Sequence, residues 1–308
     1  MTFDSLRLQG LVFIVLALLT VFLSLLFGPL PSQYEWWLAA GLIVVLGVPH
    51  GALDPLFAAA LLPLHSRVAW LGFIVIYLLL AAAVVLLWWA FPTVFLVMFL
   101  VVSVLHFSGD LLSGAHPLTR FVYGVAVISL PAAHHAADML RLFSQLVGAN
   151  AAQPVVAALE LIAWPCLLAL LWLVVFSWRQ RVGRDVWSSL EIFALGLLVW
   201  IATPLLGFAI YFCAMHSARH ILRTQQFSGL KMGRLMLVVA LPLLALLGAG
   251  TLGWRLLPDS PVDERMLQYV FVGLAALTLP HMVLVERVRL AGWPTRASAE
   301  FSGSCTRP

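Results

Sequence analysis

Three pairs of polar residues stand four positions apart inside long apolar stretches of this sequence. The pairs are His50 and Asp54 in GVPHGALD, His106 and Asp110 in HFSGD, and His216 and His220 in HSARH. Residues i and i+4 of an α-helix lie on one face, one turn apart. Three helices are therefore each predicted to present a stacked polar pair, of the residue types that bind metal ions or transfer protons.

The depth of these histidines in their apolar stretches is similar. An ionisable side chain inside a bilayer costs free energy of insertion, roughly 2.5–3.5 kcal/mol for Asp on insertion scales, and such residues usually serve a function. His50, His106 and His216 each lie about 12–14 residues into a stretch, or roughly 20 Å at the rise of an α-helix. His220 lies one turn deeper, and His281 in LPHM lies at a comparable level. Four imidazoles from three helices are predicted to surround one point.

Four neutral imidazoles suit a borderline divalent cation such as iron, copper or zinc. The three cysteines, Cys166, Cys213 and Cys305, are far apart in the chain. A structural zinc site built on thiolates is therefore disfavoured. An all-nitrogen site with open coordination positions would suit Fe(II) and O₂ chemistry.

The residues around the ligands can also be predicted. A histidine that binds a metal usually donates its other ring N–H to a carboxylate or a carbonyl. We therefore expect Asp54 and Asp110 to support the histidines one turn away. His281 and Tyr211 are expected around the ligands, although a ligand or packing role for His281 stays open. Pro49 and its neighbouring glycines should interrupt the helix and let its backbone approach the site.

The composition indicates the elements that carry these residues. The 308-residue chain is 63% hydrophobic and only 10% charged, with a mean hydropathy of +1.05. A soluble domain carries about a quarter charged residues, so the solvent of this chain is predicted to be a lipid bilayer. We predict an all-α integral membrane protein, a bundle of about ten transmembrane helices. Their expected ranges are 8–28, 36–62, 68–91, 93–113, 119–144, 153–178, 187–203, 205–224, 233–256 and 265–288.

The distribution of basic residues predicts the orientation. With ten spans and a cytoplasmic N-terminus, most of the 17 lysines and arginines fall on or near the cytoplasmic side, as the positive-inside rule requires. Both termini are then cytoplasmic. Residues 1–290 form one transmembrane domain, and residues 291–308 form a polar, flexible cytoplasmic tail. We expect a multi-pass protein of the cell (inner) membrane, without a cleaved signal peptide, whose basic pI reflects loops and not nucleic-acid binding.

Four motifs, taken in order along the chain, resemble a known family. PHGALD, HF-x-x-D, YF-x-x-x-HS-x-RH and LPHM-x-x-VE are similar to motifs of the Brp/Blh family of membrane-embedded β-carotene 15,15'-dioxygenases, over residues 36–290. The resemblance implies a non-haem Fe(II) held by His50, His106, His216 and His220. It also implies O₂ as co-substrate, central cleavage of β-carotene or a related carotenoid to two all-trans-retinal molecules, and a rhodopsin that receives retinal.

Two motifs depart from the family pattern. HFSGD lacks the second glycine-acidic pattern expected after HF, which affects the role of Asp110. LPAAHHAAD matches the family P-x-x-x-H segment only loosely. His134 and His135 are adjacent and point about 100° apart on a helix, so both cannot face one site well.

Other functions fit parts of the sequence. A membrane di-iron desaturase or hydroxylase uses H-x-x-x-H, as in HSARH, but also needs H-x-x-H-H clusters, which this chain lacks. A bis-histidine haem protein needs paired histidines about 12–14 residues apart, a spacing absent from every predicted span. A transporter or proton relay would use membrane histidines and aspartates but needs no iron. A carotenoid-binding protein that has lost cleavage is a fourth alternative.

Overall fold

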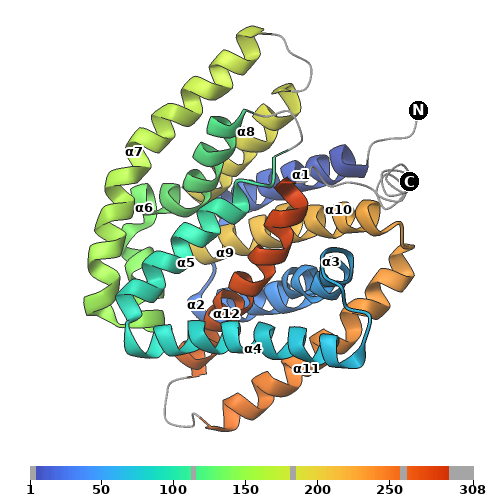
Figure 1. Cartoon of the computed structure of the whole chain (residues 1–308). Helices are drawn as coiled ribbons and strands as arrows, with labels where there is room; N and C mark the ends of the chain where they lie inside the picture. The colour runs from blue at the N-terminus through green and yellow to red at the C-terminus, as the bar shows by residue number, and fades with distance from the viewer. Residues whose placement is uncertain (1–4, 112–115, 181–184, 257–261, 291–308) are drawn as a thin grey trace.

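The computed structural model describes residues 5–111, 116–180, 185–256 and 262–290 (Figure 1). These residues are almost entirely helical and include no strand. The α-helices are α1 (Ser5–Phe27), α2 (Ser32–Leu42), α3 (Asp54–Leu61), α4 (Arg67–Ala90), α5 (Pro92–Phe107), α6 (Pro117–Val147), α7 (Ala149–Gln180), α8 (Asp185–Ile201), α9 (Pro204–Ile210), α10 (Ala218–Ser228), α11 (Met232–Leu256) and α12 (Val262–Leu290). A π-helix, η1 (Ile43–Gly47), and a 3₁₀-helix, η2 (Val48–Leu53), join α2 to α3, and a second π-helix, η3 (Tyr211–Ser217), joins α9 to α10.

The all-helical prediction is confirmed, and each predicted span overlaps one run of helical residues, α, π or 3₁₀, in the described part of the chain. Six runs are long and apolar enough to cross a membrane: 5–27, 32–61, 67–90, 149–175, 204–228 and 265–289. Helices 92–107, 187–201 and 232–245 are apolar but shorter. The chain is therefore a membrane protein by helix length and composition. The predicted tail, 291–308, lies outside the described residues.

Several helix ends have a local cause in the sequence. Proline, which lacks an N–H and has a fixed φ, occupies the first position of α5, α6 and α9, where no intrahelical donor is needed. The Oγ of Ser66 accepts a hydrogen bond from the Ala69 N–H at 3.1 Å and so caps α4. Gly229 ends α10 in the left-handed conformation, with φ of +66°. The breaks expected near Phe91–Pro92 and Thr203–Pro204 are thus real helix boundaries.

The outer surface is apolar, as a lipid-facing surface must be. α4 contains no buried residue, and the exposed fractions reach 79% for Trp89 and 77% for Leu161. In water such a surface would cost much free energy, since every Å² of exposed apolar area costs about 25 cal/mol. This pattern agrees with hydrocarbon as the surrounding medium.

α12 crosses the middle of the view in Figure 1 and contacts α2, α3, α4, α5 and α6. α5 and α6 approach each other closely at Gly124, where a Cβ would lie 2.2 Å from the carbonyl oxygen of Val104. Only glycine allows the two backbones to come so near, as small residues do in membrane helix packing.

A buried ion pair joins α8 and α10. Arg219 of α10 binds Glu191 of α8 with N–O distances of 2.6 and 3.0 Å, and both side chains are at most 1% exposed. Its Nε also donates to Oε1 of Gln9 on α1 at 2.7 Å. Gly10 leaves the space that this pair needs, because a Cβ there would lie 2.2 Å from Glu191 Oε1. A buried pair of this kind specifies how three helices fit together.

Candidate metal centre

The segment GVPHGALD passes the centre of the bundle as a non-α helix. The π-helix η1 ends at Gly47 and the 3₁₀-helix η2 begins at Val48, so Pro49 stands at the second position of η2. His50 Nδ1 donates a hydrogen bond to the Gly47 carbonyl at 2.5 Å. Short π and 3₁₀ segments within α-helices are frequent at functional sites. The expected interruption of this helix is confirmed, and it fixes the ring orientation of His50.

Four more histidines come from four further elements. His106 lies in the last turn of α5. His216 lies in η3 and His220 in α10, which continues from it. His281 follows Pro280 inside α12. All four, and His50, are buried, with exposed fractions of 2–7%.

These five imidazoles form one cluster. Ring centroids are 4.5 Å apart for His106 and His216, 4.9 Å for His50 and His216, and 5.5 Å for His50 and His220. His281 lies 5.1 Å from His106 and from His220, and 5.2 Å from His50. We call this group the histidine cluster. Its members include every residue predicted from the sequence to be a ligand.

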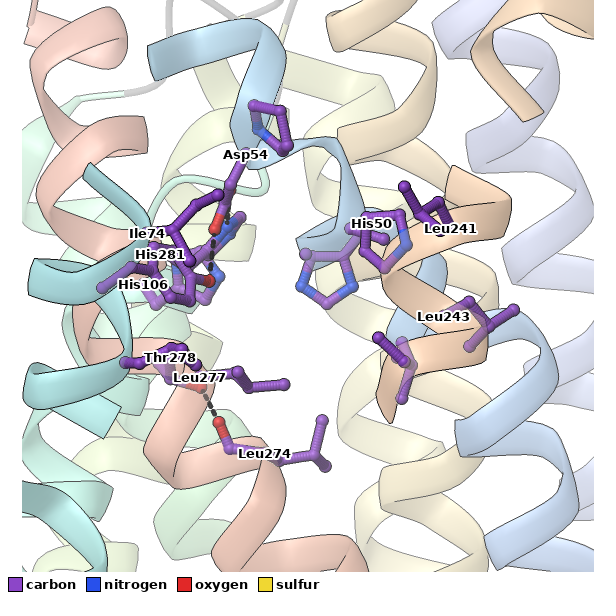
Figure 2. A pocket seen from close by; sticks show the side chains of 18 of the residues that line it. His50, Asp54, Ile74, His106, Leu241, Leu243, Leu274, Leu277, Thr278 and His281 are labelled. Carbon is purple, nitrogen blue, oxygen red and sulfur yellow. Dashed lines mark hydrogen bonds and ion pairs between the residues drawn. The ribbon is translucent and has the colours of Figure 1, made fainter. Parts of the chain in front are cut away.

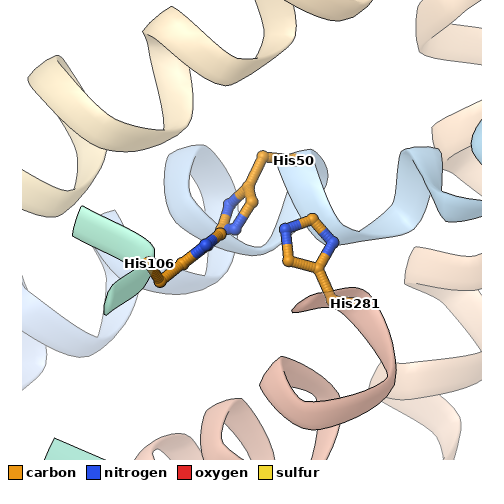
Figure 3. A group of neighbouring side chains, drawn as sticks. All are labelled: His50, His106 and His281. Carbon is orange, nitrogen blue, oxygen red and sulfur yellow. The ribbon is translucent and has the colours of Figure 1, made fainter. Parts of the chain in front are cut away.

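Three members of the histidine cluster already have the spacing of metal ligands. His50, His106 and His281 each offer one ring nitrogen, and these nitrogens lie within 4.8 Å of one another. Figure 3 shows the three rings converging from separate helices. A single cation between them could bind all three.

The hydrogen bonds of the rings define their free nitrogens. Nδ1 of His216 donates to the Asp110 carboxylate at 3.0 Å, and Nδ1 of His281 donates to Asp54 at 2.6 Å. In a neutral imidazole the other nitrogen, Nε2, is then an acceptor. Among the described residues, Nε2 of His106, His216 and His281 is buried without a hydrogen-bond partner. Buried polar atoms are normally paired, so these nitrogens fit a metal that binds between them.

Each carboxylate is held in turn by a tyrosine. The Tyr77 hydroxyl donates to Asp54 at 2.7 Å, and the Tyr211 hydroxyl donates to Asp110 at 2.5 Å. Two Tyr–Asp–His chains therefore approach the histidine cluster from different helices. Each fixes the tautomer of its histidine, as the partners of metal-bound histidines do. Tyr211 contacts Asp110, and its expected role around the ligands stays a prediction.

The aspartates support different histidines from those expected. Asp54 contacts His281 and not His50, because η2 has about three residues per turn and turns positions four apart by about 120°. Asp110 contacts His216 and not His106, because α5 ends at Phe107 and Asp110 lies beyond it. The prediction that both pairs stack on a continuous α-helix is wrong.

Tyr77 was not predicted from the sequence. It lies within the apolar helix α4, and its hydroxyl is the polar group that reaches Asp54 from that helix. The available signal was its rarity: only five tyrosines occur in the chain, and this one stands in an otherwise apolar span. A buried tyrosine hydroxyl usually has a partner.

His134 and His135 make contacts away from the histidine cluster. α6 is kinked at His135, whose φ is −120° and ψ 36°. The His134 ring stacks on Trp200 of α8 at 5.4 Å, and His135 Nε2 lies 3.2 Å from the Trp200 carbonyl. The Cys213 thiol donates a hydrogen bond to the Leu42 carbonyl at 3.2 Å.

A cavity of about 560 Å³ opens beside the histidine cluster, and we call it the main cavity. His50, His106 and His281 form part of its wall, with Asp54 and Tyr77 close by. Figure 2 shows these histidines above the apolar side chains of α12. Most of the other lining residues are apolar or aromatic, from η2, α4, α5, α9, η3, α11 and α12. A large apolar molecule could therefore lie against the nitrogens.

The sequence matches the model of a known protein family. The family model described as Beta-carotene 15,15'-dioxygenase matches residues 41–288. This chain belongs to the beta-carotene 15,15'-dioxygenase family. A protein of uncultured marine bacterium 66A03, named "Beta-carotene 15,15'-dioxygenase", is 33% identical over 261 residues, which cover 81% of this chain and 92% of that protein. No solved structure matches.

The family membership confirms the resemblance seen in the four motifs. It supports an oxygenase that acts in carotenoid cleavage. The matched residues, 41–288, include the whole histidine cluster and both Tyr–Asp–His chains.

Proposed function

We propose that this chain is an Fe(II)-dependent dioxygenase that cleaves the central 15,15' double bond of β-carotene with O₂ and releases two molecules of all-trans-retinal. One observation carries the proposal: of five clustered, buried imidazoles, three (His50, His106 and His281) lie in the wall of a large apolar cavity. The family supplies the reaction and the substrate class. Imidazole ligands without thiolates suit iron, and both oxygen atoms enter the aldehydes, so no external electron donor is needed.

The proposed ligands are His50, His106, His216 and His220. We add His281 as a further candidate, because its ring has the same environment as that of His216: Nδ1 bound to an aspartate, and Nε2 buried without a partner among the described residues. Bound iron would supply the reactivity toward O₂ that side chains lack.

The protein supplies position and a dry environment. Asp110 and Asp54 keep Nδ1 protonated on His216 and His281, so that Nε2 faces the centre of the histidine cluster. The apolar wall of the main cavity favours a hydrocarbon and excludes water. The polyene can then lie with its central bond beside the histidines, protected from side reactions.

The membrane arrangement is part of the proposal. We propose ten membrane crossings in the cell (inner) membrane, with both termini cytoplasmic. Residues 1–290 would form one transmembrane domain, and 291–308 a polar cytoplasmic tail. Substrate would come from membrane lipid and retinal would return to it, with a rhodopsin as one acceptor. Nucleic acid has no part in this function.

The test is production of retinal in a bacterium engineered to accumulate β-carotene. Cells that express the chain should lose orange colour and contain retinal, whereas His216→Ala cells should keep their carotene. A His134→Ala variant is a matched histidine control and should remain active, because His134 stacks on Trp200. Unequal apocarotenals would refute the 15,15' assignment. Unchanged carotene and no iron in the purified protein would favour a proton relay or transporter.

A further inference from the structure

The π-helices η1 and η3 pack against each other beside the histidine cluster. η1 ends at Gly47, shortly before His50, and η3 contains His216. The Phe212 ring of η3 contacts both imidazoles, with centroid distances of 5.3 Å to His50 and 5.4 Å to His216. The relative position of two proposed ligands therefore depends on how these two irregular segments fit together.

Pro49 removes a hydrogen-bond donor where η1 meets η2. In a 3₁₀-helix each carbonyl accepts a hydrogen bond from the N–H three residues later. The 3₁₀ partner of the Leu46 carbonyl would therefore be residue 49, which is a proline and has no N–H. Inside a membrane an unpaired carbonyl is costly, because no water is there to bind it. The Leu46 carbonyl thus needs a donor from another part of the chain.

A hydroxyl group from η3 supplies this donor. Ser217 Oγ donates to the Leu46 carbonyl at 2.6 Å and lies 3.1 Å from the Gly47 carbonyl. A hydroxyl carries a single hydrogen, so the two carbonyls share it. Ser217 is 0% exposed, and solvent cannot compete for this bond. The residue that directly follows His216 therefore holds the backbone that leads into η2.

The Gly47 carbonyl in turn orients His50. It accepts a hydrogen bond from His50 Nδ1 at 2.5 Å, which leaves Nε2 as the acceptor of the neutral ring. His216 and His281 are held in the same way, except that their acceptors are the carboxylates of the two Tyr–Asp–His chains. Ser217, the Gly47 carbonyl and His50 thus form a third chain, in which a hydroxyl contacts the acceptor of a ring N–H.

We propose that Ser217 is a positioning residue for the metal centre, because its hydroxyl fixes the Leu46–Gly47 backbone and so places the His50 ring relative to His216. The inference rests on the proposed function and adds to it a residue outside the ligand set. Ser217 does not line the main cavity. Loss of its hydroxyl should therefore change metal binding and the rate of the reaction, but not the binding of the carotenoid.

The test removes this hydroxyl and compares it with a neighbouring donor. Ser217→Ala deletes the contacts to Leu46 and Gly47. Cys213→Ala is the matched control, because the Cys213 thiol donates from the same π-helix to the carbonyl of Leu42, at the end of α2 and well before His50. Ser217→Thr keeps the hydroxyl and adds a methyl group at a fully buried position, so it perturbs packing without removing the donor.

Metal binding to metal-free protein is the main measurement. We expect Ser217→Ala to weaken Fe(II) binding about tenfold, as loss of a partner of a ligand histidine does, and to change the visible absorption spectrum of the Co(II)-loaded protein. Ser217→Thr should lower Tm through overpacking and yet keep the wild-type Co(II) spectrum. Cys213→Ala should keep that spectrum too. With β-carotene, Ser217→Ala should lower kcat about as much as metal affinity and leave KM unchanged.

A second background provides the test if Ser217→Ala does not fold. Pro49→Ala restores an N–H three residues after Leu46, and this N–H can bind the Leu46 carbonyl in place of the serine. The double variant Pro49→Ala/Ser217→Ala should then fold. It should still bind Fe(II) more weakly than Pro49→Ala does, because the contact to Gly47 stays lost. Equal Fe(II) affinity in these two proteins would overturn the inference.

The other outcomes also decide between the hypotheses. Wild-type Fe(II) affinity and an unchanged Co(II) spectrum in folded Ser217→Ala would overturn the inference, whatever its Tm. An equal loss of affinity in Cys213→Ala or Ser217→Thr would overturn it too, because general packing would then explain the effect. If the wild-type chain binds metal but leaves β-carotene intact, the proposed function fails and the titrations still decide the inference. A wild-type chain that binds neither Fe(II) nor Co(II) would overturn both.

Discussion

His281 of α12 and Asp54 of α3 meet across the bundle with an Nδ1–Oδ1 distance of 2.6 Å. The residues are 227 positions apart, and both are buried beside the main cavity. The carboxylate thereby orients a histidine on a helix far from its own. Tyr77 completes the chain from α4.

Replacing Asp54 by Asn should weaken iron binding. The amide cannot match the charge of the carboxylate, and loss of such a partner typically costs about 10–100-fold in metal affinity. Titration of metal-free protein with Fe(II) measures the effect. Tyr77→Phe, which removes only the hydroxyl, should have a smaller effect. Full iron affinity and full rate in Asp54→Asn would show that Asp54 serves packing alone.

His281→Ala should lower the iron content as much as His220→Ala does, if His281 is a ligand. The measurement is iron per purified protein by mass spectrometry. His134→Ala should keep full iron, since its ring stacks on Trp200. If His281→Ala keeps iron but loses activity, His281 acts from outside the ligand set.

Removal of the metal should lower the thermal stability in detergent. The proposed ligands come from η2, α5, η3 and α10, so a bound cation joins separate elements. A cation at 100 times its Kd contributes about 2.7 kcal/mol. Chelation should lower Tm, and added Fe(II) should restore it. The double variant His50→Ala/His216→Ala should not respond, and a response there would indicate that iron binds elsewhere.

Gly124→Ala should destabilise the contact of α5 with α6. The new Cβ would lie 2.2 Å from the Val104 carbonyl oxygen, and backbone cannot move away as a side chain can. Overpacking typically costs about 1–3 kcal/mol, visible as a lower midpoint in thermal unfolding. Gly72→Ala on α4 is the matched control, because its Cβ would meet nothing within 4 Å. Equal midpoints for both variants would refute the close approach.

Arg219→Met should be among the most destabilising substitutions. It leaves Glu191, which is 1% exposed, as a buried charge without its partner, and breaking a buried pair costs about 3–5 kcal/mol. The double variant Arg219→Met/Glu191→Leu should recover part of the loss. A double variant no more stable than Arg219→Met would mean that the contacts of Arg219 to Asp110 O and Gln9 dominate.

The sequence predicted the helical class, the positions of the helical runs and the gathering of the histidines. The four-residue spacing of the polar residues and their similar depth in the apolar stretches were sufficient for this prediction. Polar side chains inside a bilayer must face the protein interior, so few packing arrangements of the helices are possible. The partners of Asp54 and Asp110 could not be predicted. They depend on a 3₁₀ segment and on a helix end at Phe107, and no spacing rule encodes which distant histidine then comes within reach.

The membrane crossings and their orientation are still predictions based on charge. Tyr77 shows a different limit: a single hydroxyl in an apolar helix carries no pattern, and only the packing of α4 on α12 brings it to Asp54.

The length of the π-helix η3 also determines how α10, which follows it, is rotated about its own axis. A π segment holds one residue more than an α-helix would in the same turn, and one residue corresponds to about 100° of rotation. Deleting one residue within Tyr211–Ser217 would therefore swing α10 by more than a quarter turn, and with it Arg219, His220 and Arg223. A change in the length of η3 cannot be compensated by a substitution at one position, because it rotates every residue that follows. The number of residues in η3 is thus a constraint on this chain in addition to the identities of Tyr211 and His216.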